Sequence, residues 1–93
     1  MNVHHLKCLK PFYQLSLDGI KPWEVRINDR NYQDGDILLL QEYEPLHVSY
    51  TGRQHYVKVV KVISLFTLFK VAKLVGMTCF PVSDEELKYL NLK

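Results

Sequence analysis

Cysteine is scarce in this chain of 93 residues, and the motifs that usually employ it are missing. Cys8 and Cys79 lie far apart and form no C-x-x-C pair, so we expect two reduced structural thiols and neither a zinc cage nor a disulfide framework. The four histidines have no spacing that presents three ligands to one metal; they are His4, His5, His47 and His55. We therefore expect no metal and no other cofactor.

Several motifs of catalytic sites are also absent from the sequence. It contains no glycine-rich phosphate loop, no G-x-S-x-G nucleophile elbow and no cysteine–histidine pair with nucleophile spacing. A catalytic hypothesis therefore depends on Lys21 with a carboxylate, and Glu24 is the candidate. A lysine acts as a nucleophile or base only where burial favours its neutral form.

Long hydrophobic segments are lacking as well. The apolar run 62–69 is far shorter than the roughly 20 residues that span a bilayer, and residues 1–10 lack the apolar core and cleavage site of a secretory signal. We expect a cytoplasmic protein without membrane contacts. The length, with 47% hydrophobic and 24% charged residues, predicts a single folded domain over residues 1–93.

The first half of the chain has the pattern of short strands around one helix. Residues 3–9 are typical of a strand, and Pro11 suits the first turn of a short helix that Asp18 and Gly19 close. Residues 33–36 predict a turn because Gly35 tolerates positive φ. The apolar run 37–40 indicates a strand covered on both sides.

The second half predicts further strands and two helices. We expect a turn at 50–53 and a strand at 55–63, in which the doublet 59–60 interrupts the alternation like a β-bulge. Polar residues three apart predict a helix over 65–75 that Gly76 ends.

After a short extended segment at 77–82, the capping-box pattern from Ser83 predicts a final helix over 83–90. The order of strand, helix, several strands, helix, short strand and helix indicates an α+β fold. Its middle strands are expected to curl into a small β-barrel flanked by short helices.

Charged and apolar side chains alternate along the strand that follows the first helix. Trp23, Val25 and Ile27 are expected to face the core, while Glu24 and Arg26 share the other face about 7 Å apart. The charged side chains are expected to turn toward a concave pocket. A base-stacking role for Trp23 is the alternative if it lies at the open end of the strand.

Lys21 lies at the mouth of this strand, and together with Glu24 and Arg26 it can hold a phosphate or the polar edge of a base. Asp29 and Arg30 extend the charged pattern into the next turn. The alternative is a solvated strand face with a weak surface ion pair.

A second group of candidate ligand-binding residues lies at the expected turn 50–53. Tyr50, Thr51 and Arg53 are its members. The net charge is only +2, but residues 31–44 hold acidic and no basic side chains, whereas residues 45–83 hold Lys and Arg and no acidic ones. Either the two blocks are neighbouring strands that pair their charges, or the basic block forms a face that receives phosphate.

Several motifs in order resemble the ASCH superfamily; they are His4-x-Leu6-Lys7, Gly19-x-Lys21-x-x-Glu24-x-Arg26-x-x-Asp29-Arg30, Gly35-Asp36, Glu42-Tyr43 and Tyr50-Thr51-Gly52-Arg53. More narrowly, residues 3–63 are similar to a small uncharacterised ASCH-like subfamily of bacteria and phages. The resemblance implies a PUA-like fold, a compact β-barrel flanked by helices, in which the segment from Gly19 to Arg26 lines a cleft. By analogy with PUA domains, it also implies RNA as a partner.

One branch of that superfamily hydrolyses N4-acetylcytidine with a lysine, a threonine and a downstream glutamate. Lys21 matches the lysine, but Glu24 stands at the threonine position, and no acidic residue between Pro45 and Ser83 matches the glutamate. The resemblance therefore implies binding rather than this amidohydrolase reaction, although Lys21 and Glu24 could support other chemistry.

Three hypotheses follow from the sequence. The first is a module that binds RNA or a nucleotide-like ligand in a charged cleft, without chemistry. The second is a small hydrolase of a modified nucleoside that uses Lys21 and Glu24. The third is a protein-interaction module in which the helix 65–75 docks a partner or a second copy of the chain as a homodimer.

Overall fold

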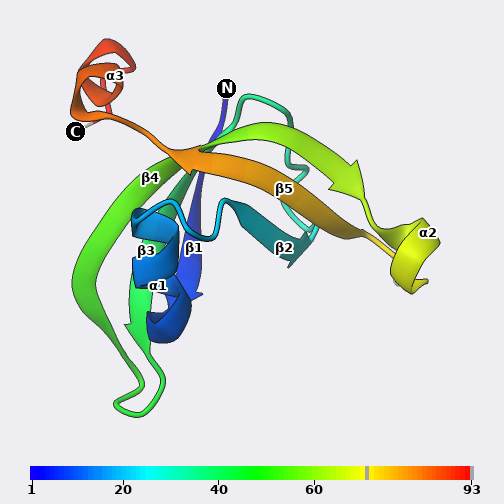
Figure 1. Cartoon of the computed structure of the whole chain (residues 1–93), viewed down its shortest axis with the longest axis horizontal. Coiled ribbons are helices and arrows are strands. Elements are labelled where there is room, and N and C mark those ends of the chain that lie inside the picture. The colour runs from blue at the N-terminus through cyan, green and yellow to red at the C-terminus, as the bar shows by residue number, and fades with distance from the viewer. Residues whose placement is uncertain (71, 93) are drawn as a thin grey trace.

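The computed structural model describes residues 1–70 and 72–92 of the chain. In this part of the chain, five strands form one sheet in the order β1-β3-β4-β5-β2 (Figure 1). The strands are β1 (Val3–Leu9), β2 (Trp23–Ile27), β3 (Ile37–Glu44), β4 (Ser49–Ser64) and β5 (Leu74–Pro81). The helices are α1 (Lys10–Leu17), α2 (Phe66–Phe69) and α3 (Asp84–Tyr89). The α+β class is therefore confirmed.

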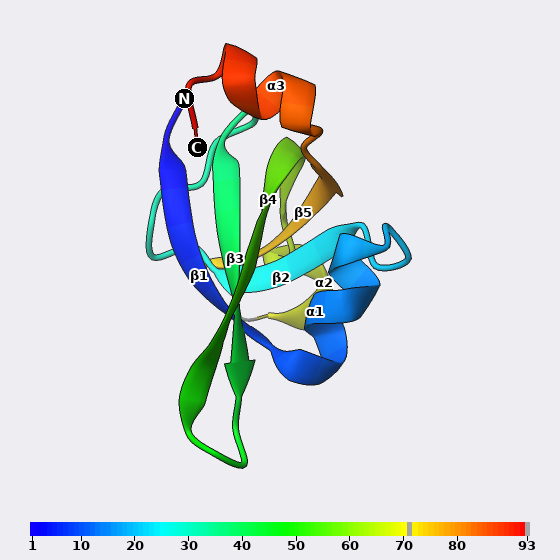
Figure 2. The same cartoon turned by 90° about the vertical axis from the view of Figure 1, so that its left-hand side faces the viewer.

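The sheet is curled into a half-barrel (Figure 2). Strand β1 runs parallel to β3, whereas the β3–β4, β4–β5 and β5–β2 pairs are antiparallel. The two edge strands, β1 and β2, are brought toward each other by the curl but share no ladder. The predicted barrel is thus present as a curled sheet with an open seam between β1 and β2.

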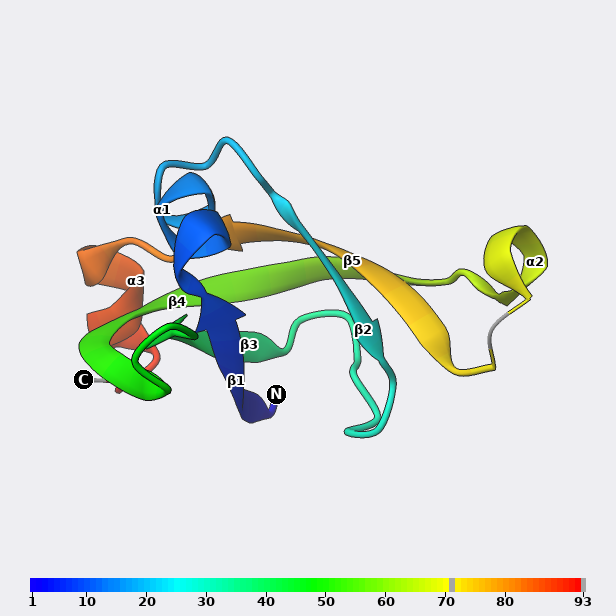
Figure 3. The same ribbon diagram turned by 90° about the horizontal axis from the view of Figure 1, so that it is seen from below.

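The core lies inside the curl, where α1 packs on one side of the sheet (Figure 3). Residues 37–40 are buried, as predicted for a strand covered on both sides. The thiols of Cys8 and Cys79 are free and buried, and burial raises the pKa of Cys8 to about 11 and that of Cys79 to about 12. The expectation of two structural thiols is confirmed.

Most local predictions hold where the chain has a strong local signal. Helix α1 has Pro11 in its first turn, and Gly35 has φ of +91° in the predicted turn. Val60 is an extra residue between the pairs Val59–Cys79 and Lys61–Thr78, which is the predicted bulge. Ser83 caps α3 by accepting a hydrogen bond from the backbone N–H of Glu86.

Two predictions about the second half are wrong. The chain does not turn at 50–53, because β4 runs from Ser49 to Ser64 and the turn comes earlier, over residues 45–48. The helix predicted over 65–75 is only the four-residue α2, at the end of the arm formed by β4 and β5 (Figure 1). Gly76 ends no helix, since it pairs with Val25 and Ile63 inside β5; residue 71 lies outside the described residues.

The hypothesis of a docking helix at 65–75 therefore loses the helix on which it depended. Phe66, Leu68 and Phe69 in the short α2 are exposed. A homodimer stays a prediction. Of the helices in the described residues, none has the length and apolar content needed to cross a membrane.

The prediction of which side chains of β2 face the core is also wrong. Trp23, Val25 and Ile27 were expected in the core, but they are 50%, 52% and 49% exposed. Glu24, between them, is only 4% exposed, so the charged face of the strand points into the curl. The expectation that the charged side chains turn inward is correct, and the apolar ones form the outer face instead of the core.

Candidate functional site

A cleft of about 390 Å³ opens along the seam between β1 and β2. One wall comes from the end of β1 and the start of α1, and the other from β2 and the residues before it. The lining residues are Lys7, Cys8, Leu9, Phe12, Lys21, Trp23, Glu24, Val25 and Arg26. The structure therefore brings together Lys21, Glu24 and Arg26, the main site residues predicted from the sequence.

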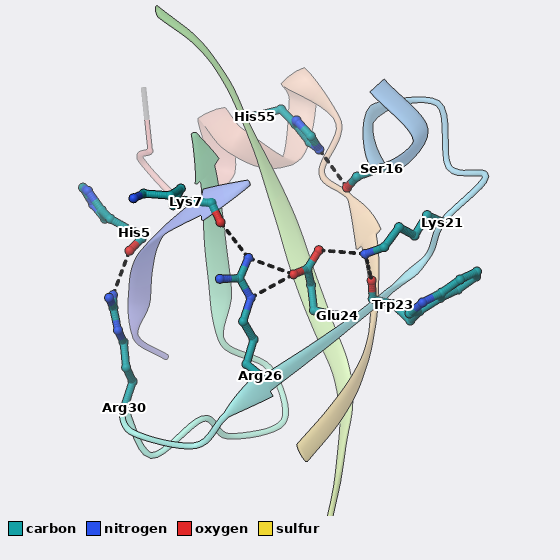
Figure 4. Close-up of polar contacts among 9 residues, drawn as sticks. All are labelled: His5, Lys7, Ser16, Lys21, Trp23, Glu24, Arg26, Arg30 and His55. Atoms are coloured by element: carbon teal, nitrogen blue, oxygen red, sulfur yellow. Dashed lines mark hydrogen bonds and ion pairs between the residues drawn. The ribbon is translucent and has the colours of Figure 1, made fainter. Parts of the chain in front are cut away.

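Glu24 is the centre of this group (Figure 4). Its side chain is 6% exposed, and its two oxygens face different cations. Nζ of Lys21 lies 3.3 Å from Oε2, while Nε of Arg26 donates to Oε1 at 3.0 Å. A buried carboxylate is tolerable only when it is paired in this way, so the weak surface pair considered as an alternative is excluded.

Lys21 lies near both aromatic side chains of the cleft. Its Nζ donates to the carbonyl oxygen of Trp23 at 2.8 Å and lies 5.7 Å from the centre of the Trp23 ring. The same Nζ lies 5.9 Å from the centre of the Phe12 ring. Trp23, half exposed at the start of β2, thus has the position that the stacking alternative required.

Guanidinium groups, not a backbone ladder, close the seam (Figure 4). Nη2 of Arg26 donates to the carbonyl oxygen of Lys7 at 2.8 Å, and Nη1 of Arg30 donates to that of His5 at 2.7 Å. Edge-strand carbonyls that would otherwise lack partners are satisfied by these contacts. Arg30 therefore links the two strands from outside the cleft lining. The side chain of Asp29 is 68% exposed, and its Oδ1 lies 3.9 Å from Nε of Arg30, which is a long and solvated ion pair.

Tyr50, Thr51 and Arg53 do not line the cleft; Thr51 and Arg53 instead contact a second buried carboxylate, Glu42. The hydroxyl of Thr51 donates to Oε1 of Glu42 at 2.6 Å, and Nη1 of Arg53 lies 3.7 Å from Oε2. Tyr50 packs edge-on against Tyr43. These contacts join the acidic and basic blocks across neighbouring strands, which confirms the charge-pairing alternative for this part of the sheet.

We expect Thr51→Val to lower the free energy of unfolding by about 2 kcal/mol, because the buried Glu42 carboxylate loses a short hydrogen bond. Urea unfolding followed by circular dichroism measures this change. Thr78→Val, on the exposed side of β5, is the matched control and should change stability by less than about 0.5 kcal/mol. Equal stabilities of the two variants would show that the Thr51–Glu42 contact contributes nothing.

Several residues of this region were not predicted as site residues from the sequence, Cys8, Leu9 and Val25 of the cleft lining among them. Lys7 and Phe12 line the cleft from β1 and α1, and only the strand order could have placed them beside β2. Ser16 and His55 lie next to it, with Ser16 Oγ 3.2 Å from Nε2 of His55 (Figure 4). Burial lowers the pKa of His55; Arg53 also lowers it and Glu24 opposes the shift.

Within the described residues, no three His, Cys, Asp or Glu side chains are grouped so that they could hold a metal ion. Nor does the cleft present a free base beside a nucleophile. Lys21 uses its ammonium on a carbonyl and a carboxylate, and both Glu24 oxygens face cations. The arrangement is suited to binding an anionic, flat ligand.

The family model described as "Domain of unknown function (DUF3850)" matches residues 3–72 of the chain. The chain belongs to this family. All cleft-lining residues fall inside the range that matches DUF3850. A relative is the "Uncharacterized 12.9 kDa protein in GpA 3′ region" of Escherichia phage P2, which is 35% identical over 63 residues. The match covers 68% of this chain and 56% of the relative, so it extends over little more than half of that protein's length.

Proposed function

We propose that this DUF3850 domain binds a nucleotide or a short single-stranded RNA in the cleft between β1 and β2. The observation that carries the proposal is the composition of the cleft, in which three cationic side chains stand against one carboxylate and two aromatic rings. Cations attract phosphate, and an exposed ring offers a stacking surface to any base.

The size of the cleft supports a small ligand. Its volume of 390 Å³ lies near the lower end of the roughly 300–1,000 Å³ found for ligand sites. The small net charge of +2 also favours a short target over a long duplex, since few phosphates could be neutralised at once. The PUA-like fold and the resemblance to the ASCH superfamily stay predictions that agree with this ligand class.

Binding without chemistry is favoured over hydrolysis. A nucleophilic lysine needs a free amine, whereas Nζ of Lys21 is held by the Trp23 carbonyl and the Glu24 carboxylate. The amidohydrolases also need a threonine and a glutamate beside the lysine. Thr51 and Glu42 do form such a pair, but neither residue lines the cleft that holds Lys21. Release of acetate from N4-acetylcytidine by the purified protein would instead support the hydrolase hypothesis.

Trp23 is the only tryptophan of the chain, so its fluorescence reports directly on the cleft. We expect nucleoside monophosphates or a six-nucleotide RNA to quench it, with an affinity that falls as salt rises. Lys21→Met should raise the dissociation constant at least about tenfold, because a cation beside both rings is lost.

Lys88→Met, which removes an exposed lysine from α3, is the matched control and should leave the dissociation constant unchanged. A strong salt dependence would favour RNA, whereas a weak one would favour a nucleoside pocket in which phosphate contributes little. Fluorescence that stays constant up to millimolar concentrations of every probe would contradict the proposal.

A further inference from the structure

The walls of the cleft present main-chain groups as well as side chains, because both walls are edges of the sheet. Strands β1 and β2 each have one neighbour, β3 and β5 respectively, and face the seam on the other side. In an antiparallel pair, successive residues alternately direct their N–H and C=O groups toward the partner strand and away from it. The phase of this alternation, meaning which residues of β1 and β2 direct their N–H and C=O groups into the seam, decides which backbone groups the cleft offers to a ligand.

The hydrogen bonds around β2 fix its phase. The backbone N–H of Cys79 donates to the carbonyl of Pro22 at 3.1 Å, and the register between β2 and β5 continues without a break. Glu24 and Arg26 therefore direct their N–H and C=O groups to β5. Val25, between them, directs both groups away from β5 and into the seam.

The neighbours of Val25 confirm this phase. The carbonyls of Trp23 and Ile27 also point away from β5. That of Trp23 accepts a hydrogen bond from Nζ of Lys21, and that of Ile27 accepts one from the backbone N–H of Asp29 at 2.8 Å. Strand β2 has no ladder on its seam side, and among the loop and side-chain hydrogen bonds of the described residues none involves the N–H or C=O that Val25 directs into the seam. This donor and acceptor lie side by side on one residue that lines the cleft.

The opposite wall adds donors. The backbone N–H of Ile37 donates to the carbonyl of Asn2 at 2.8 Å, which sets the phase of β1 against β3. Lys7 and Leu9 therefore direct their backbone groups toward the seam, and Arg26 occupies the carbonyl of Lys7. Their N–H groups face the cleft from the side opposite Val25.

We propose that the main chain of Val25 reads the Watson–Crick edge of a nucleobase seated in the cleft; this inference rests on the proposed function. Every nucleobase carries an adjacent donor and acceptor on that edge, which match the C=O and N–H of one extended residue as a neighbouring strand would. The aromatic rings of Trp23 and Phe12 flank the base, and the cations of the cleft hold its phosphate.

Methylated bases test this reading without any change in the protein. N3-methyluridine monophosphate has lost the donor of its Watson–Crick edge, and N1-methyladenosine monophosphate has its ring acceptor blocked. We expect each to bind at least tenfold more weakly than the unmodified nucleotide, measured by quenching of Trp23 fluorescence.

Val25→Pro tests it from the protein side, because proline deletes the N–H that faces the cleft and leaves the β5 ladder intact on an edge strand. We expect at least a tenfold loss of affinity for uridine monophosphate. Ile27→Pro, which deletes an outward N–H on a residue outside the cleft lining, is the matched backbone control.

The outcomes separate this inference from the proposed function. Suppose that the wild type binds methylated and unmodified nucleotides equally well, that Val25→Pro binds uridine monophosphate like the wild type, and that Lys21→Met binds it weakly. The proposal that the main chain of Val25 reads the base is then wrong, and the proposed function stands. If the wild type binds none of the nucleotides, the proposed function itself fails. Should Val25→Pro not fold, the methylated bases alone decide, since they are measured on the wild-type protein.

Discussion

Glutamine in place of Glu24 is expected to lower the free energy of unfolding by about 3 kcal/mol, more than any other change in the cleft. The carboxylate is 6% exposed and holds both Lys21 and Arg26, so its neutral replacement leaves two partly buried cations without their counter-charge. The glutamine amide also points a donor at one of these donors. Urea unfolding of the wild type and Glu24→Gln at neutral pH measures the difference.

A double-mutant cycle shows whether the cost comes from the charge cluster. Lys21→Met removes one of the stranded cations, so the double variant should be more stable than the sum of the two single effects by at least about 1 kcal/mol. Glu85→Gln on α3 removes an exposed carboxylate and should cost no more than about 1 kcal/mol. If Glu24→Gln unfolded at the urea concentration of the wild type, the pairing of Glu24 would have no energetic importance.

The carboxylate of Glu24 also positions the cations that the proposed ligand would contact. Arg26 touches Glu24 and the carbonyl of Lys7 with one guanidinium group, so its orientation is fixed before any ligand binds. Lys21 is held in the same way by Glu24 and the carbonyl of Trp23. Two pre-oriented cations lose less conformational freedom on binding than mobile surface lysines would.

Elements with a strong local signal could be predicted from the sequence. The strands at 3–9 and 55–63 and the buried run 37–40 follow from apolar and β-branched residues, which need no knowledge of distant neighbours. The cap at Ser83 follows in the same way from a side chain that bonds within its own turn. The bulge at Val60 was visible as a break in the alternation.

The orientation of β2 could not be predicted, because alternation distinguishes two faces and does not say which of them is inside. The usual rule places apolar residues in the core, and it fails here since Lys21 and Arg26 neutralise Glu24 within the curl. The helix expected at 65–75 ends after Phe69, because Lys70 takes a left-handed backbone conformation. The backbone N–H of Leu65 donates to the carbonyl of Leu74, so the chain turns back and continues as β5 from Leu74.

Only some residues of the cleft could be predicted from the sequence. Lys21, Glu24 and Arg26 are near neighbours along the chain, so their spacing was sufficient to group them. Lys7 and Phe12 join them because the sheet order leaves β1 and β2 as facing edges, which is a property of the tertiary fold. Thr51 and Arg53 were grouped correctly with each other, but β4 places them beside Glu42.

The second large effect is expected at Asp36, which joins the start of β1 to the turn before β3. Its carboxylate is 2% exposed and accepts hydrogen bonds from the backbone N–H groups of Asn2 and Gln33, both at 3.0 Å, with Nε2 of His4 2.9 Å away. Asp36→Asn turns one acceptor into a donor against these groups, and we expect a loss of about 3 kcal/mol in urea unfolding at neutral pH. Asp29→Asn, at an exposed carboxylate, is the control and should change stability little.

The stability that Asp36 contributes should depend on pH in a defined direction. Burial by itself would raise the pKa of Asp36, but the hydrogen bonds from His4, Asn2 and Gln33 outweigh it and hold that pKa below its ordinary value of 3.8. Since the unfolded chain then binds the proton more readily, the contribution is complete above pH 3.8 and is lost as the pH falls through the lower value of the folded state. The stabilities of wild type and Asp36→Asn, measured at a series of pH values, should therefore converge on the acid side. A difference that stays constant into the acid range would mean that the carboxylate charge is not what holds β1 in place.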